Sequence, residues 1–324
     1  MVAVIIMMAE ADDDEIFVYM GGEQQVPDEV RRARIHKDVK IVRAGAFSDR
    51  RQLISVEFHD GIEIIEEAAF HYCISLRGAI KLLGIKIIKG WAFGHTGLTS
   101  VEFGDKLETI EHDAFTTCTG LTKIKMLSVR IVGKGAFGWC HELSDVEFGE
   151  ALRALQARAF TNCGKLKRTA LPLLKGNMIE EDVFGGCRRL ETIDLVGGID
   201  QTVASLHLES WRSDMNNEIN RIYQALPTTC TWGEKSAVIQ QWMERVSCQL
   251  NRYKAGHKDM MKEATTLLEL ALWKANLDDK NGGEIEREGV RTTRGSRKRA
   301  RKEVCVTSGA DVVIKNVLPF LALK

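Results

Sequence analysis

The sequence predicts an α+β protein, in which a β-solenoid is followed by a helical hairpin or bundle. A short motif returns at a nearly constant interval over residues 41–198, and this is the main observation behind the prediction. The hydrophobic pattern then changes from alternation to helical spacing over residues 199–277. The chain has 324 residues and no net charge, and its hydrophobic content of 44% excludes a wholly disordered protein.

The repeated motif centres on a phenylalanine that follows a small apolar residue. Its spacings are 23, 23, 22, 22, 23 and 24 residues. This period is typical of a solenoid in which each coil buries its apolar face only against its neighbours. The phenylalanines are Phe47, Phe70, Phe93, Phe115, Phe137, Phe160 and Phe184.

Other apolar columns keep step with the phenylalanine. Alternation such as that of residues 98–103 places Val101 on the inward face and Ser100 and Glu102 on the outward face. A second column lies upstream of the phenylalanine and is also predicted to point inward. Its members are Ile41, Ile65, Ile88, Ile110, Val132 and Leu155.

Five cysteines share one column, three residues after the phenylalanine. A thiol row of this kind could bind metal, form disulfides or pack in the core. Stacked side chains point in parallel, whereas disulfides and tetrahedral zinc need convergent ligands, so the geometry favours packing. We therefore predict no metal and no cofactor. The column consists of Cys73, Cys118, Cys140, Cys163 and Cys187.

The order L-x-x-I-x-x-x-A-F-x-x-C-x-x-L-x-x-V-x-F, as in residues 107–126 and 152–171, resembles the BspA-type leucine-rich repeat family. The resemblance extends over residues 41–195. It implies a curved right-handed solenoid that binds proteins or surfaces. It provides no catalytic residues to transfer to this chain, and we predict that the protein is not an enzyme.

The outward residues of the predicted strands vary in charge from coil to coil, which indicates a partner-binding face. The same alternation could also serve only to keep an open sheet soluble. The predicted face consists of Ser55, Glu57, Ser100, Glu102, Lys123, Lys125, Asp145, Glu147, Arg168 and Asp194.

Two apolar stripes indicate helices after the repeats. The first runs from Leu208 to Leu226 and ends at Pro227. The second runs from Ile239 to Ala271 with alternating steps of four and three, the spacing of a coiled-coil seam. These helices could form a hairpin that caps the repeats, or they could mediate self-association. Residues 1–40 are predicted to form an N-terminal segment and cap.

Residues 278–303 form a basic linker, and residues 304–324 an apolar C-terminal segment. The basic run from Arg287 to Lys302 suggests an alternative function, a nuclear or nucleic-acid-associated adaptor. No aromatic residues interleave with it, which argues against base stacking and against nucleic acid as a partner. The candidate segment consists of Arg297, Lys298, Arg299, Arg301 and Lys302.

The sequence also predicts an intracellular protein, cytoplasmic or nuclear rather than secreted. No basic residue precedes Arg31, and the cysteines show no C-x-x-C pair. The chain contains no window of 18 apolar residues, so no membrane span is predicted. The G-x-G-x-x-G match at residues 133–138 falls within the repeat register and lacks a surrounding βαβ unit, so it predicts no nucleotide site. The predicted function is a non-enzymatic scaffold for a protein partner.

Overall fold

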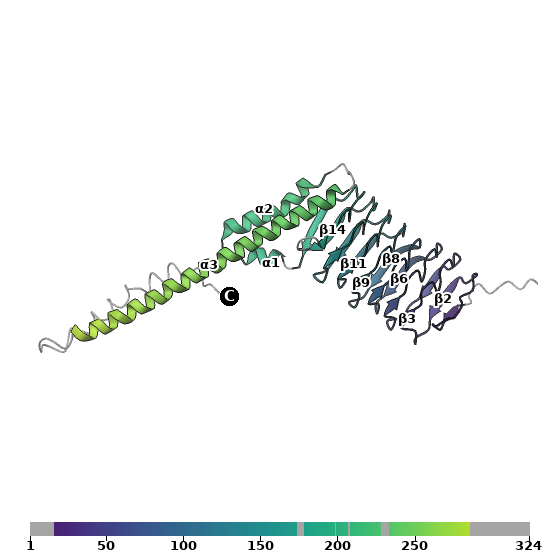
Figure 1. Cartoon of the computed structure of the whole chain (residues 1–324), viewed down its shortest axis with the longest axis horizontal. Helices are drawn as coiled ribbons and strands as arrows, with labels where there is room; N and C mark the ends of the chain where they lie inside the picture. The colour runs from purple at the N-terminus through teal and green to yellow at the C-terminus, as the bar shows by residue number, and fades with distance from the viewer. Residues whose placement is uncertain (1–15, 174–177, 198, 207, 228–232, 286–324) are drawn as a thin grey trace, which may run out of the picture. The chain divides into compact units, whose positions relative to one another are not determined.

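The computed structural model describes residues 16–173, 178–197, 199–206, 208–227 and 233–285. Parallel strands form a solenoid over residues 16–197, and three helices follow (Figure 1). Contacts divide the chain into two compact units. One unit comprises Met1–Asp200 with Asn216–Ser247, and the other Gln201–Met215 with Cys248–Lys324.

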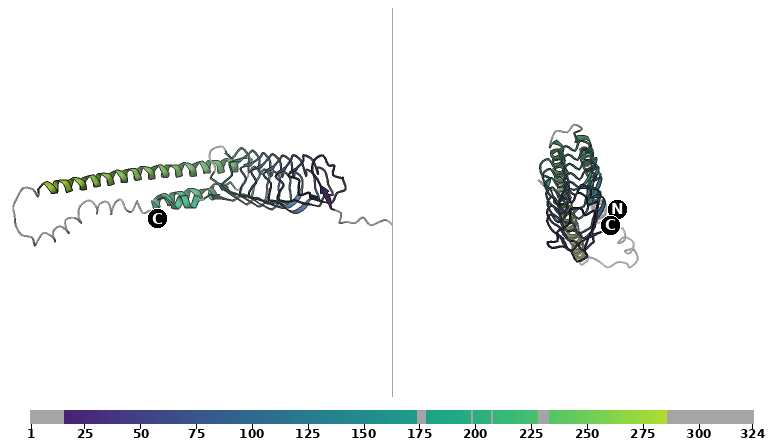
Figure 2. Two further views of the ribbon diagram at one scale, coloured as in Figure 1. Left: turned by 90° about the horizontal axis from the view of Figure 1, so that it is seen from below. Right: turned by 90° about the vertical axis from the view of Figure 1, so that its right-hand side faces the viewer.

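Each coil of the solenoid contributes one very short strand to a six-stranded parallel sheet, ordered β13-β11-β9-β7-β5-β3. The coils stack along one axis, so each strand pairs with its equivalents in the neighbouring coils (Figure 2). The strands are β3 (Ile41–Val42), β5 (Ile64–Ile65), β7 (Ile87–Ile88), β9 (Thr109–Ile110), β11 (Ile131–Val132) and β13 (Ala154–Leu155).

Longer strands form a second side of the solenoid as three parallel sheets, ordered β1-β2-β4, β6-β8 and β10-β12-β14-β15. Buried and exposed residues alternate in most of them, as the sequence predicted. The strands are β1 (Phe17–Tyr19), β2 (Arg32–Ile35), β4 (Ser55–Glu57), β6 (Arg77–Leu82), β8 (Gly97–Phe103), β10 (Lys123–Met126), β12 (Asp145–Phe148), β14 (Arg168–Pro172) and β15 (Thr192–Val196).

The phenylalanine column forms the centre of the core. Its seven side chains are at most 1% exposed, and successive rings stack with centroids 4.9 to 5.9 Å apart. Each backbone N–H of the column except the last donates to a carbonyl one coil further on, from Phe47 N to Ala69 O at 2.7 Å through Phe160 N to Val183 O at 2.9 Å. The hydrogen bonds of this column therefore all point toward the C-terminal coil.

Left-handed backbone residues flank each phenylalanine at a distance of two residues on both sides. All of them have φ between 52° and 74°, although most are not glycine. This conformation costs energy for residues with a side chain, and here the coil-to-coil hydrogen bonds maintain it. The column after the phenylalanine, which we call the turn column, consists of Asp49, Tyr72, His95, Thr117, Trp139, Asn162 and Gly186.

The cysteine column is buried and its thiols are free. Each thiol donates to the carbonyl of the phenylalanine one coil earlier, as in Cys118 Sγ to Phe93 O at 3.2 Å and Cys140 Sγ to Phe115 O at 3.2 Å. Burial raises the pKa of Cys118 to about 11 and that of Cys73 to about 12, so the thiols stay protonated. The column thus has the packing role that its geometry predicted.

At two places the inward residues differ from those that the repeat pattern indicates. Val42 occupies the inward position of the first coil and is fully buried, whereas Ile41, which the sequence suggested, is half-buried. In the second coil, the strand register shifts between Gly78 and Ala79. This bulge turns Ile80 and Leu82 inward, at 5% and 1% exposure.

The last coil is closed by the start of helix α3 (Glu234–Ile285). Phe184 N has no further coil to donate to, and it donates instead to Ser236 Oγ at 3.0 Å. The side chain of Lys235 donates to the carbonyls of Arg188 and Leu190, at 3.1 and 2.8 Å. These contacts satisfy backbone groups that an open edge would leave unpaired.

The helices α1 (Ile199–Ala204) and α2 (Glu209–Ala225) precede α3. In the first unit, Trp242 Nε1 donates to Glu218 O at 2.9 Å. In the second unit, the rings of Trp211 and Tyr253 stack with centroids 4.8 Å apart. Helix α3 therefore contacts helix α2 within each unit.

Among the described residues, no helix is long and apolar enough to cross a membrane. Strand β1 pairs in parallel with β2, so residues 16–40 extend the strand ladder, and the predicted N-terminal cap is not shown. Self-association through the seam of α3 stays a prediction. The basic linker predicted at residues 278–303 begins later than expected, since α3 continues to Ile285. The rest of that linker and the segment predicted at residues 304–324 lie outside the described residues.

Candidate functional site

The residues predicted for the partner face all lie in the longer strands (Figure 1). They alternate along these strands with residues that are buried in the core. Those in β4, β8 and β10 are exposed, and those in β12, β14 and β15 are half-buried. Contacts between β4 and β6 and between β8 and β10 link the three sheets. We call this surface the strand face.

Opposite charges meet across neighbouring strands of the strand face. In β6 and β8, Lys81 Nζ lies 3.1 Å from Glu102 Oε2. In β10 and β12, Lys125 Nζ lies 3.0 Å from Glu147 Oε2. Arg34 of β2 pairs in the same way with Glu57 of β4, which lowers the pKa of that carboxyl group. Each sheet therefore neutralises much of its own charge.

Lys123 is an exception on this face. It lies beside Asp145 in the strand register, but Asp145 Oδ2 accepts a hydrogen bond from Ser144 Oγ at 2.8 Å. Within the described part of the chain, Lys123 forms no ion pair, and its side chain is exposed. The ammonium group of Lys123 is therefore exposed to solvent without a contact ion pair.

Asp194 is engaged at the other end of the strand face. Its carboxylate lies 2.6 Å from Arg168 Nε and accepts a hydrogen bond from Tyr223 OH of α2 at 3.3 Å. Burial, followed by the charge of Asp194, raises the pKa of Tyr223. Helix α2 thus occupies this end of the predicted face.

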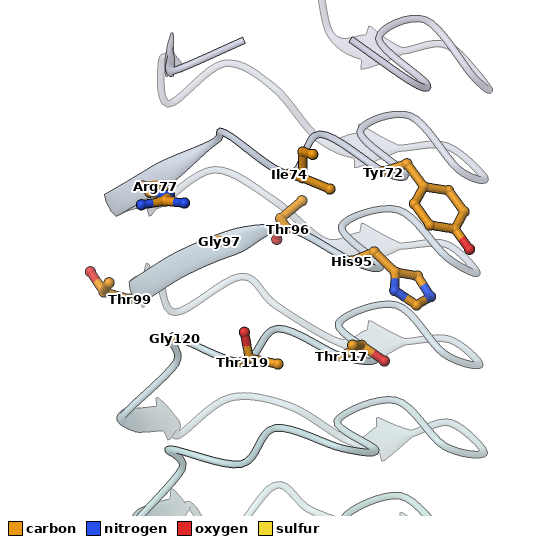
Figure 3. A pocket seen from close by; sticks show the side chains of 10 residues that line it. All are labelled: Tyr72, Ile74, Arg77, His95, Thr96, Gly97, Thr99, Thr117, Thr119 and Gly120. Carbon is orange, nitrogen blue, oxygen red and sulfur yellow. The ribbon is translucent and has the colours of Figure 1, made fainter. Parts of the chain in front are cut away.

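A hollow of about 470 Å³ lies between the turn column and the start of strands β6 and β8 (Figure 3). The rings of Tyr72 and His95 stack at one margin, with centroids 4.4 Å apart and planes 9° apart. Arg77 lies on the opposite side, near Gly97. The lining residues are Tyr72, Ile74, Arg77, His95, Thr96, Gly97, Thr99, Thr117, Thr119 and Gly120.

Sequence reasoning missed this hollow and two residues of the ion pairs on the strand face. Lys81 was missed because the bulge at Gly78 moves it outward, and Arg34 because it precedes the first recognised repeat. Tyr72 and His95 share the offset of two residues from their phenylalanines, which was the available signal. Their side chains differ, so no column was visible.

The candidate nucleic-acid segment at Arg297–Lys302 lies outside the described residues, and the comparisons below give no support for a nucleic-acid role. Within the described residues, no group of three or more His, Cys, Asp or Glu side chains could hold a metal ion.

Parallel coils of 22 to 24 residues, each with a phenylalanine and an inward leucine, define a leucine-rich repeat solenoid. The chain belongs to the BspA type leucine rich repeat family. The family matches residues 40–130 and 121–210, which together cover just over half of the chain. No curated protein matches it.

Solved structures with a similar fold come from bacteria. A leucine rich cell surface protein from Faecalibacterium prausnitzii is 21% identical, with a TM-score of 0.36 over 54% of this chain and 62% of its own length. The leucine rich repeat protein of T. pallidum is 21% identical, with a TM-score of 0.37 over 51% of this chain and 69% of its own. The pneumococcal vaccine antigen PcpA is 20% identical, with a TM-score of 0.31 over 57% and 38%.

The intracellular location predicted from the sequence is wrong by this comparison. The family is represented here by a protein named as a cell surface protein and by a vaccine antigen. The prediction relied partly on cysteines without a pairing motif. These cysteines form a buried packing column, and their spacing follows the coil period. They therefore carry no information about the redox compartment.

Proposed function

We propose that the chain is a non-enzymatic scaffold that binds a protein partner through the strand face, in the setting of a cell surface. The main supporting observation is Lys123, an exposed lysine without an ion pair among the described residues, on a face whose other charges are largely paired. Family membership supports a role in interaction or at a surface. The partner would present a carboxylate opposite Lys123.

Paired charges on the face add specificity and contribute little affinity. Exposed ion pairs contribute about 0–1 kcal/mol to stability, so a partner can exchange them at small cost. A charge that already has no partner gains the most when a complementary group arrives. Lys123 is therefore expected to dominate the electrostatic part of binding.

Affinity capture with the full chain tests this proposal. The charge reversal Lys123→Glu should reduce recovery of the specific partner about tenfold or more, because a repulsive contact replaces an attractive one. Recovery is measured by quantitative mass spectrometry, and circular dichroism verifies that the variant is folded.

Lys165→Glu is the matched control. Lys165 is an exposed lysine outside the longer strands, where it pairs with Glu142 at 2.6 Å. This variant should leave partner recovery unchanged. Equal losses for both variants, or no interactor that depends on Lys123, would overturn the proposal.

A further inference from the structure

We propose that the hollow between the turn column and strands β6 and β8 is a binding site for an acidic oligosaccharide (Figure 3). The site adjoins the strand face at the start of β6 and β8, but neither Lys123 nor Lys125 lines it. The hollow combines a pair of aromatic rings, unengaged hydroxyl groups and one unpaired arginine.

The aromatic surface is built into the backbone. Tyr72 and His95 both adopt the left-handed conformation, with φ of 58° and 61°, and this carries their side chains to the outer margin of the coil. The two rings stack on each other and form one aromatic cluster, in which Tyr72 is 38% exposed. Burial lowers the pKa of His95, so its ring is uncharged at neutral pH. Aromatic faces attract the polarised C–H groups of a sugar ring.

Two glycines keep the centre of the hollow free of side chains. Gly97 and Gly120 each precede the inward leucine of their coil, and the equivalent residues of the next two coils are Glu142 and Lys165. Those two long side chains form an ion pair across the coils. At Gly97, a Cβ atom would lie 2.8 Å from Arg77 Cγ, so the glycine makes room for the arginine stem.

Polar groups of the right kind surround this space. The hydroxyl groups of Thr99, Thr117 and Thr119 have no hydrogen-bond partner in the described part of the chain. Hydroxyl groups both donate and accept, which matches the hydroxyl groups of a sugar. Ile74 is the one aliphatic side chain among the lining residues, so an apolar peptide side chain would find few partners in the hollow.

Arg77 determines the charge of the ligand. The guanidinium group has no carboxylate partner among the described residues, and the lining contains no acidic side chain. An unpaired arginine is suited to bidentate binding of a carboxylate. The preferred ligand is therefore a sugar that carries a carboxyl group, such as a sialic or uronic acid.

Titration of the full chain with sialyllactose, and with lactose as its neutral core, tests the proposal. Sialyllactose should bind about tenfold more tightly than lactose, as expected for one charge-assisted contact. Arg77→Gln should remove this preference. Tyr72→Asn should weaken both sugars about tenfold, and asparagine retains the tolerance for the left-handed backbone.

Two variants serve as matched controls. Trp139→Asn alters an exposed aromatic residue of the same turn column, two coils beyond His95 and outside the hollow. Arg130→Gln removes an exposed arginine elsewhere on the solenoid. Both should bind sialyllactose as the wild type does.

The proposal is overturned if neither sugar binds, if the two bind equally, or if the controls lose as much affinity as Arg77→Gln and Tyr72→Asn. A polyglutamate peptide provides a further arm. Binding of this peptide, sensitive to Arg77→Gln in the absence of sugar binding, would assign the hollow to an acidic protein segment and would also overturn the proposal.

Discussion

The phenylalanine column and the turn column follow the same seven coils, two residues apart, yet they differ completely in composition. The first has one residue type, buried and stacked. The second has seven different residues, all with the same left-handed backbone. Coil-to-coil hydrogen bonds impose the backbone on both columns. Only the inward column also has its side chain determined by its neighbours, and the turn column is left free to vary.

Replacement of a central phenylalanine gives the largest expected effect. Phe115 stacks between Phe93 and Phe137 at 5.1 and 5.2 Å, so Phe115→Ala leaves a cavity and should cost about 3–5 kcal/mol. Trp139→Ala removes a larger but half-exposed ring from the turn column, and should cost less than about 1 kcal/mol. Urea unfolding measures both, and similar costs would remove the distinction between the columns.

The cysteine column predicts an intermediate effect that depends on pH. Burial raises the pKa of Cys118 to about 11, above its ordinary value of 9.0. Above pH 9 the unfolded thiol therefore ionises while the folded thiol does not, and the free energy of unfolding falls as pH rises. Between pH 7 and pH 10 the free energy of unfolding should decrease in both proteins. The Cys118→Thr variant lacks one such thiol, so its decrease should be about 1 kcal/mol smaller than that of the wild type.

Threonine is the appropriate substitute because Thr96 already occupies this column in the third coil. Thr96 is 2% exposed, and its hydroxyl donates to Phe93 O at 2.9 Å. The comparison of wild type and variant cancels the other groups that titrate in this range. An identical pH dependence for the two proteins would mean that the Cys118 thiol ionises in the folded state.

The smallest expected effect concerns the turn column. Thr117 is β-branched and has a φ of 58°, a conformation that asparagine tolerates better. Asn162 occupies the same column two coils later. Thr117→Asn should therefore stabilise the protein by about 0.5–1 kcal/mol, measured by urea unfolding. A loss of stability would mean that the threonine side chain, and not only the backbone, is specified at this position.

The sequence predicted the solenoid well because its inward columns repeat in residue type. Prediction failed by one residue at Ile41, where two adjacent aliphatic residues fit the pattern equally well. It also failed at Lys81, because a bulge at Gly78 is not encoded by the residues that follow it. A period of 22 to 24 residues averages over such local shifts, so the fold could be predicted while the register of one strand could not.

The candidate sites were harder to predict, for a related reason. Charged side chains on the strand face form ion pairs across coils, as Lys125 does with Glu147, and such pairs depend on the strand register. The hollow depends on glycines at 97 and 120 and on aromatic residues at 72 and 95, which share an offset but no residue type. Both candidate sites lie at positions where the coils differ, and a search for repeated residues does not detect such positions.

The contact between Phe184 and Ser236 has a consequence for how the array can change in length. The hydroxyl group of Ser236 accepts a hydrogen bond from the backbone N–H of Phe184, and every phenylalanine of the column has this N–H in the same direction. Helix α3 therefore binds a backbone group that every coil has, and the contact does not depend on the side chains of the last coil. Whole coils could be duplicated or deleted within the array, by recombination at the level of the gene, without redesign of its end.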